Sequence, residues 1–185
     1  MDGHAIFVVQ QPTLTMSRPS AKEYGSFYQT YIKYTSGKDY SILVQQYNER
    51  IIAFWDAIPL EKINYSYGPG KWTIKQMFQH VIDTERIFAY RALAIARGEA
   101  TPIPGFDENE YANNATAGNR NWKDMLVEWR VVRQSTNLLF ASFTEEQQKR
   151  LGTASDNPMS VNALGFIIFG HALHHLHILK ERYHI

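Results

Sequence analysis

The sequence contains no cysteine among its 185 residues. This absence excludes disulfide bonds and thiolate metal ligands, and it leaves the chain without a nucleophilic thiol of its own. Any thiol chemistry would therefore have to be supplied by a substrate. A chain without disulfides suits a reducing compartment, so we expect a cytoplasmic location.

The sequence also lacks a charge imbalance and a long apolar run. Its 19 Lys and Arg residues offset 18 Asp and Glu residues, which leaves a net charge of +1. This balance gives no electrostatic reason to expect nucleic acid or an acidic membrane as a partner. The longest apolar stretch, residues 163–169, is far too short to cross a bilayer. We therefore expect a small-molecule substrate, with no nucleic acid and no membrane among the partners.

Several common catalytic motifs are missing. The chain has no H-E-x-x-H, no G-x-S-x-G and no phosphate-binding loop. Di-iron bundles need paired Glu-x-x-His motifs with further glutamates, whereas this chain has a single Glu-x-x-His, from Glu181 to His184, at its end. These absences disfavour zincin proteases, serine hydrolases of the α/β type, nucleotide-binding proteins and di-iron enzymes.

What the sequence does contain is ample material for one core. Hydrophobic residues make up 44% and aromatic residues 14% of the chain, and its length suits a single domain. The first residues contain an apolar patch, residues 5–9, but no basic segment precedes it, so we do not expect a signal peptide. We expect residues 1–20 to form a disordered extension and residues 21–185 to form the domain.

Apolar residues recur at helical spacing in four long segments, and no segment has a convincing strand pattern. We expect long helices over 39–58, 74–97, 122–143 and 161–183, a short helix over 144–150, and a short helical arm over 24–32. Four amphipathic helices of similar length predict an all-α four-helix bundle. The connections are long, above all residues 99–120, so the order need not be up-down-up-down.

Residues at the ends of these segments support the boundaries. Asp39 and Ser160 are suitable N-caps, and Thr73 with Gln76 has the pattern of a capping box. Gly98 is placed to end the second long helix.

Four of the seven histidines lie in the segment GHALHHLHILKERY, residues 170–183. His171 and His175 are four residues apart, so on a helix they share one face and lie about 6 Å apart along the axis. Two imidazoles at this spacing can converge on one metal ion. His174 lies to one side of this face, and His177 points away from it.

A third ligand should come from another helix, and His80 is the best candidate. It interrupts the apolar stripe of WTIKQMFQHVIDTERIF, and Asp83 and Thr84 follow one turn later, where they could orient an imidazole. Other interpretations stay open. The histidines could be partnered core residues, or Asp83 or Glu85 could replace one histidine in a site with two histidines and one carboxylate.

Three stretches resemble the DinB-like/YfiT superfamily. They are YGPGKWTIKQMFQHVIDTERIFAYRALAIARGE, PIPGFDENEYA and GHALHHLHILKERY. In that superfamily a G-K-W-[ST] turn precedes a helix with a histidine, an Asp-x-Glu and an arginine, and the last helix carries G-H-x-x-H-H. The resemblance covers residues 26–183 and implies a DinB/YfiT-type four-helix bundle with long interhelical loops.

The resemblance also implies a set of site residues. By motif position, His80, His171 and His175 would hold a divalent metal ion. Asp83 would be a base or an orienting group. Glu85 and Arg91 match the pattern, and we expect them to form an ion pair that holds their helix.

The better-understood relatives of this superfamily are similar to metal-dependent transferases of small thiols or to hydrolases. Three histidines leave an open coordination position, which is typical of catalytic sites. Zinc or nickel is the expected ion, with iron and manganese as alternatives. Tyr28, Tyr31 and the loop 104–106 are expected to wall the pocket.

The alternatives are a metal-binding protein without catalysis and an interaction module with structural histidines. Bundles of this kind often pair, so a homodimer is expected.

Overall fold

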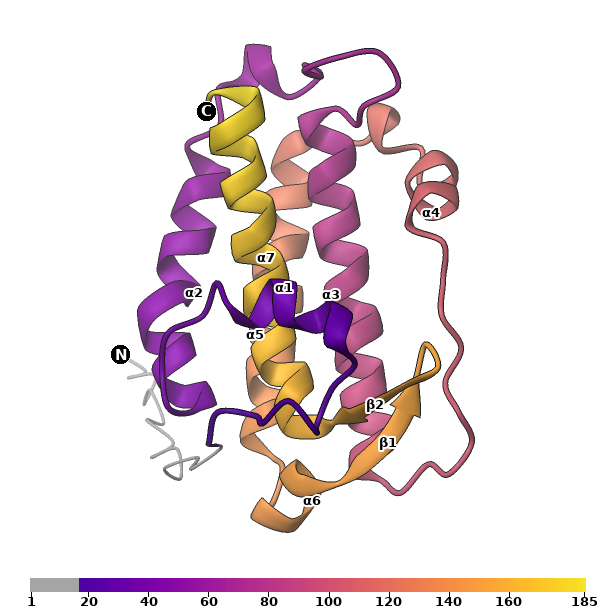
Figure 1. The fold of residues 1–185 in the computed structure, drawn as a ribbon. Coiled ribbons are helices and arrows are strands. Elements are labelled where there is room, and N and C mark those ends of the chain that lie inside the picture. The colour runs from indigo at the N-terminus through magenta and orange to yellow at the C-terminus, as the bar shows by residue number, and fades with distance from the viewer. Residues whose placement is uncertain (1–16) are drawn as a thin grey trace, which may run out of the picture.

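The computed structural model describes residues 17–185. The expected disordered extension falls largely on residues 1–16, which lie outside the described residues. Four long helices form a bundle, which confirms the predicted fold (Figure 1). They are α2 (Tyr40–Asp56), α3 (Ile74–Ala96), α5 (Trp122–Ala141) and α7 (Val161–Tyr183).

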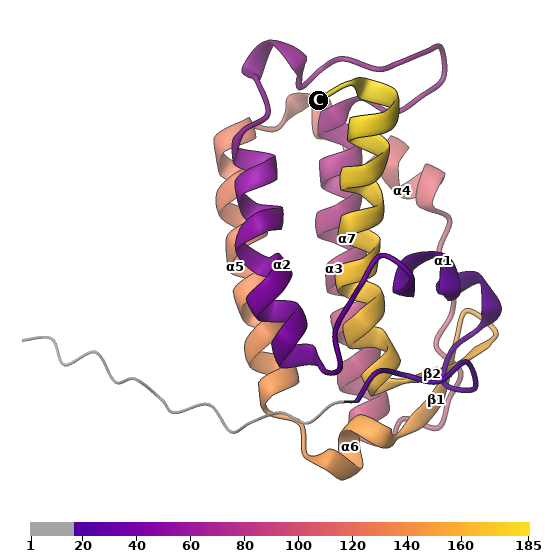
Figure 2. The same cartoon turned by 60° about the vertical axis from the view of Figure 1, so that its left-hand side comes forward.

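The order of the helices around the bundle departs from a simple up-and-down arrangement. Helices α2 and α3 each pack against both α5 and α7, which places α2 and α3 at opposite corners (Figure 2). The neighbours α3 and α5 run in the same direction (Figure 1). The chain between them therefore has to return along the length of the bundle. This return carries the short helix α4 (Glu108–Asn114) and a 3-10 turn, Ala117–Asn119, on the outside of α3.

The helix starts follow the capping residues in the sequence. The Asp39 side chain accepts a hydrogen bond from the Ile42 N–H at the start of α2. Thr73 and Gln76 form the expected capping box before α3, and Ser160 caps α7. These side chains satisfy N–H groups that have no partner within the first turn of a helix.

The predicted arm is a 3-10 turn, Ser26–Tyr28, followed by α1 (Gln29–Ile32). It crosses α7 near the middle of the bundle (Figure 1). The crossing depends on Gly170, because a Cβ at that position would lie 2.3 Å from the carbonyl oxygen of Tyr31. The glycine at the start of the histidine segment therefore permits close approach of the arm.

The expectation of no strands is wrong. After α6 (Glu145–Lys149), β1 (Leu151–Ala154) and β2 (Asn157–Ser160) form an antiparallel hairpin. Ser155 and Asp156 have φ of 50° and 59°, as a two-residue type I′ turn requires. The usual Asn-Gly or Asp-Gly signal is missing there, and four residues a strand are too few for a clear alternation.

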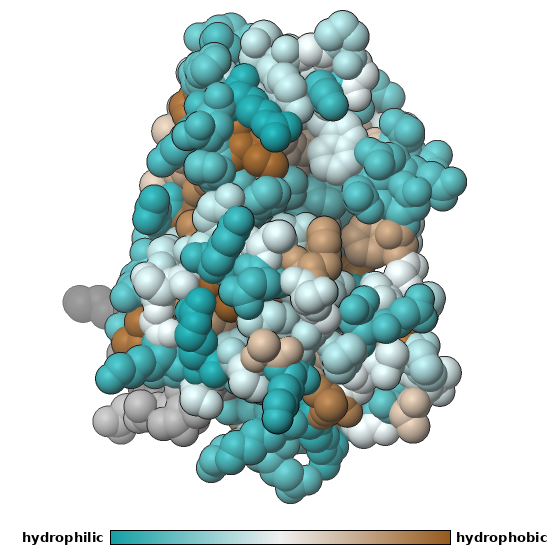
Figure 3. Space-filling view, in the orientation of Figure 1, coloured by the Kyte–Doolittle hydropathy of each residue, from teal (hydrophilic) through white to brown (hydrophobic). Residues whose placement is uncertain are grey.

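The core is rich in aromatic side chains, among which the Trp55 and Phe78 rings stack 4.2 Å apart between α2 and α3. On the face that carries α1 and α7, the surface is mainly hydrophilic with small, separate hydrophobic areas (Figure 3). None of the helices within residues 17–185 combines the length and the apolar character needed to cross a membrane.

Candidate metal centre

Three buried histidines from two helices meet in the middle of the bundle. His80 comes from α3, and His171 and His175 come from successive turns of α7. The Nε2 atom of His171 lies 3.0 Å from Nε2 of His80 and 3.0 Å from Nε2 of His175. Among the described residues, these three form a group whose ligand atoms all lie within 4.8 Å of one another.

The three nitrogens cannot satisfy one another. A contact between two imidazole nitrogens needs one N–H donor and one lone pair, and a neutral ring offers only one of these at Nε2. His171 Nε2 faces two neighbours, so it can pair with one of them at most. A cation would accept all three lone pairs at once. The donor set therefore fits a divalent metal ion with nitrogen ligands.

The protonation of the histidines also suits metal binding. Burial, with a smaller contribution from the nearby His174, lowers the pKa of His80 to about 4. Burial likewise lowers the pKa of His171 and of His175 well below the ordinary value, with the neighbouring imidazoles adding to the effect. All three rings are therefore neutral at pH 7, the form in which imidazole binds metals.

The outer nitrogens of the rings differ in their contacts. Thr84 Oγ1 lies 3.4 Å from Nδ1 of His80, where it can accept a hydrogen bond from the tautomer that leaves Nε2 free. The buried Nδ1 of His175 has no hydrogen-bond partner within the described part of the chain. Thr84 lies where an orienting group was expected.

The histidines form part of the wall of a cavity of about 410 Å³. Much of the rest of the wall is aromatic, from the side chains of Phe27, Tyr28, Tyr31, Trp72, Phe88 and Phe106. The Tyr31 ring centre lies 5.2 Å from that of His171, and the Trp72 ring centre lies 4.9 Å from that of His80. Tyr28, Tyr31 and Phe106 thus lie where the sequence predicted them, whereas Pro104 and Gly105 line a neighbouring cavity.

The other histidines of α7 lie outside the group of three. His174 lines the cavity, with its ring centre 5.4 Å from that of Tyr31 and 5.5 Å from that of Tyr34. His177 is exposed. This placement agrees with the positions expected from the helical spacing.

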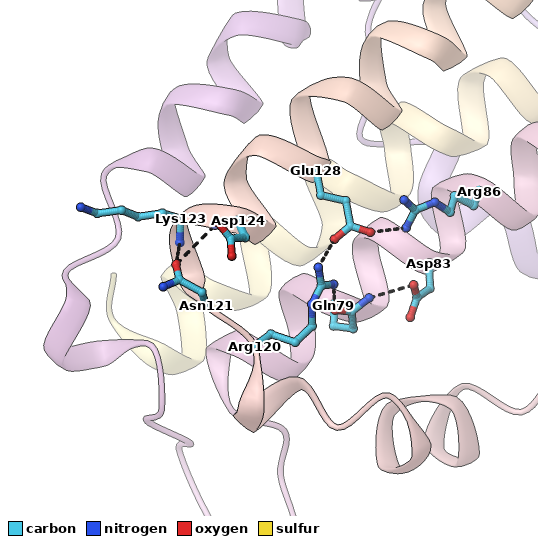
Figure 4. A network of polar contacts seen from close by, with 8 residues as sticks. All are labelled: Gln79, Asp83, Arg86, Arg120, Asn121, Lys123, Asp124 and Glu128. Carbon is cyan, nitrogen blue, oxygen red and sulfur yellow. Dashed lines mark hydrogen bonds and ion pairs between the residues drawn. The ribbon is translucent and has the colours of Figure 1, made fainter.

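Asp83 does not face the histidines in this structure. Its carboxylate accepts a hydrogen bond of 2.9 Å from the Gln79 amide, and Gln79 also binds Arg120. Arg120 and Arg86 both pair with Glu128 of α5 (Figure 4). Burial raises the pKa of Asp83, and the Gln79 hydrogen bond opposes that rise. Asp83 therefore belongs to a network between α3 and α5, and its predicted role at the metal stays a prediction.

The expected ion pair between Glu85 and Arg91 is absent from the described residues. Glu85 instead pairs with Arg133 of α5, and both side chains are buried. Arg91 points elsewhere and lines the histidine cavity. The sequence did not assign Arg91, Ser155 or Asn157 to the cavity, and the last two come from the unpredicted hairpin. The signal available in the sequence was the helical spacing that places Arg91 on the same stripe as His80 and Thr84.

Comparison with known proteins adds two findings. The family model of the DinB superfamily matches residues 43–179. YfiT from Bacillus subtilis, described as a probable metal-dependent hydrolase with an unusual four-helix bundle topology, has a similar structure. It superposes with a TM-score of 0.63 at 17% identity, over 91% of this chain and 94% of YfiT. Among proteins with curated descriptions, none matches the chain significantly.

Proposed function

The chain belongs to the DinB superfamily, and on that premise we propose that it is a metal-dependent enzyme that acts on a small molecule. The observation that carries the proposal is the convergence of three neutral imidazoles, from His80, His171 and His175, on the wall of a cavity. The proposed reaction is hydrolysis or group transfer. The description of YfiT as a probable metal-dependent hydrolase supports the first.

The residues of the chain have distinct roles in this proposal. His80, His171 and His175 hold the ion, and Thr84 keeps the His80 ring in the orientation that presents Nε2. When bound, a divalent ion with three nitrogen ligands and an open position supplies Lewis acidity to a substrate group. The aromatic wall around the histidines excludes bulk water from the substrate and strengthens electrostatic interactions in the cavity.

The size of the cavity supports an enzyme over a metal carrier. A carrier or a structural site needs no room beside the ion, and structural zinc sites are usually closed by four protein ligands. Here the described residues bring only three ligands together. The adjoining space of about 410 Å³ lies within the range of small-molecule sites, roughly 300–1,000 Å³.

Elemental analysis of the protein, purified without a polyhistidine tag or added metal, tests the proposal first. We expect about one equivalent of zinc or nickel a chain, with iron or manganese as the alternatives. A zero result that persists after incubation with these ions would leave the histidines as structural residues. The protein would then be an interaction module.

The two reactions are separated by assays on the loaded protein. A hydrolase would cleave ester or amide substrates without a thiol. A transferase would act only when a small thiol and an electrophile are both present, because the chain has no cysteine to supply the sulfur. Loss of the activity on chelation and its return with metal would tie either reaction to the ion.

A homodimer stays a prediction. Val127, Val131 and Leu138 of α5 are exposed apolar side chains. Sedimentation of the untagged protein would measure its oligomeric state.

A further inference from the structure

We propose that Arg91 forms an oxyanion subsite in the histidine cavity. The substrate would then carry a carboxylate or a phosphate at a distance from the group that reacts at the metal. This inference rests on the proposed function, because it assumes that the cavity holds the substrate. It adds the chemical class of that substrate.

Arg91 is almost completely buried, with 1% of its surface exposed, yet no carboxylate pairs with it among residues 17–185. Its two hydrogen bonds both come from Nη2, which donates to the carbonyl oxygen of Pro104 at 3.0 Å and to Oγ of Ser155 at 2.8 Å. The buried Nε has no acceptor in the described part of the chain. Burial of an unpaired charge is costly, so a site of this kind calls for an anion.

Arg133 is a second buried arginine in this bundle, and it has a counter-ion that Arg91 lacks within the described residues. It is equally buried, and it pairs with the carboxylate of Glu85. Its guanidinium lies between the rings of Trp129 and Phe169, at 4.9 Å and 4.5 Å from their centres. Arg91 also lies near two rings, those of Phe88 and Phe106. The difference is the counter-ion, because the hydrogen-bond acceptors of Arg91 are a carbonyl and a hydroxyl, both neutral.

The position of Arg91 relative to the histidines suits a substrate that spans the cavity. His80, Thr84, Phe88 and Arg91 follow one another at helical spacing on α3 and all line the cavity. The Phe88 ring lies near both groups. Its centre lies 5.6 Å from Cζ of Arg91 and 6.0 Å from the centre of the His171 ring. Because both distances share the Phe88 ring centre, the distance from Cζ of Arg91 to the His171 ring centre cannot exceed their sum.

The neighbours of Arg91 suit an anion as well. Ser155 accepts from Arg91 through Oγ, which leaves its own O–H free to donate to a bound oxyanion. The acidic residue on the cavity wall is Glu108, which is exposed at the start of α4 and makes no ion pair with Arg91. A guanidinium with free donors recognises planar carboxylates and phosphates in preference to neutral groups.

Binding of matched probes to the zinc-loaded protein tests the inference. The first probe is the monohydroxamate of suberic acid, which offers a metal-binding hydroxamate at one end and a carboxylate at the other. The second is its primary amide, which is neutral at that end, and the third carries a phosphonate there. We expect calorimetry to show that an anionic probe binds about 10- to 100-fold more tightly than the amide.

Variants assign this preference to a residue. Arg91→Met should remove the preference while leaving the affinity for the amide unchanged. Arg91→Lys keeps the charge without the paired donors and should retain part of the preference. It replaces the methionine variant in this test if that variant fails to fold. Arg86→Met is the matched control, because Arg86 lies on the same helix but pairs with Glu128 outside the cavity.

The outcomes separate the two proposals. Equal affinity of the wild-type protein for all three probes would overturn the oxyanion subsite while leaving the metal site intact. A preference that survives in Arg91→Met would overturn the assignment to Arg91. If no hydroxamate binds the protein after incubation with zinc, the proposed function itself is contradicted, and the subsite falls with it. Tighter binding of the carboxylate or of the phosphonate identifies which oxyanion the site prefers.

Discussion

Helix α3 contributes to two groups of buried polar side chains. One group contains opposite charges that pair with each other, and the other contains three like groups that cannot. On the side of α5, Glu85 pairs with Arg133, so one negative and one positive charge balance inside the protein. On the side of α7, His80 meets His171 and His175, and their three like nitrogens cannot satisfy one another. Burial alone does not distinguish a structural polar group from a binding site. The difference here is that the first group contains opposite charges that pair, whereas the second contains three like donors that need a cation.

The largest effect should come from removing a member of the histidine group. His171→Ala should reduce the metal content from about one equivalent to near zero, because His171 contacts both other ligands. Helix content measured by circular dichroism should stay near normal. His174→Ala is the matched control and should keep its metal. Unchanged metal in His171→Ala would show that the ligand set is wrong.

Removing one charge of the buried Glu85–Arg133 pair should reduce stability without changing the metal content. Glu85→Gln leaves the buried Arg133 without its counter-ion, which should lower the free energy of unfolding by about 3–5 kcal/mol. Urea denaturation measures this loss, and the metal content of the folded variant should not change. The control is Glu128→Gln at a more exposed pair, where we expect a change of at most about 1 kcal/mol. An equally small change in the free energy of unfolding for Glu85→Gln would contradict the expectation that the buried ion pair needs both of its charges.

Acid should weaken the metal-free protein through the histidines. Burial lowers the pKa of His80 to about 4, whereas an unfolded histidine titrates near 6.5. Between these values the unfolded chain takes up a proton that the folded protein does not, so stability is full above pH 6.5 and falls towards pH 4. For His80 the loss is on the order of 3 kcal/mol. Denaturation in the presence of a chelator at several pH values measures it.

A variant without His80 sharpens this test. His80→Gln should show a shallower loss of stability over the same pH window, because one of the depressed groups is gone. An unchanged pH profile would mean that other groups dominate the acid response.

The smallest effect is expected at Asp83. Asp83→Asn should leave the metal content unchanged and alter the free energy of unfolding by less than about 1 kcal/mol, because its carboxylate binds Gln79 in a partly exposed network. Metal titration and urea denaturation of the variant test this placement. A tenfold loss of metal affinity would restore Asp83 to the site.

The long helices were predictable because each has a strong apolar period and a capping residue. The segment 161–183 was predicted with the bounds that α7 has. The hairpin was not predictable in the same way, since its strands are short and its turn at Ser155 and Asp156 lacks glycine. Because the hairpin was not predicted, Ser155 and Asn157 were not assigned to the cavity wall.

Within the site, the sequence was a better guide to the histidines than to the charged residues. Spacing brought His171 and His175 to one face, and the interruption of an apolar stripe singled out His80. The resemblance then implied the same three residues. Asp83 is only about 60° from His80 around the helix, but α3 packs against α7 on one side and α5 on the other. Which helix a given face meets depends on the topology, and spacing along one helix does not contain that information.

The separation of the histidines along the chain has a consequence for biosynthesis. His80 and His171 are 91 residues apart, and two of the three come from the last helix. A nascent chain that still lacks α7 has one histidine of the group and no centre. The metal binding proposed above would therefore have to follow the emergence of α7 from the ribosome. A product truncated before α7 would lack two of the three proposed ligands.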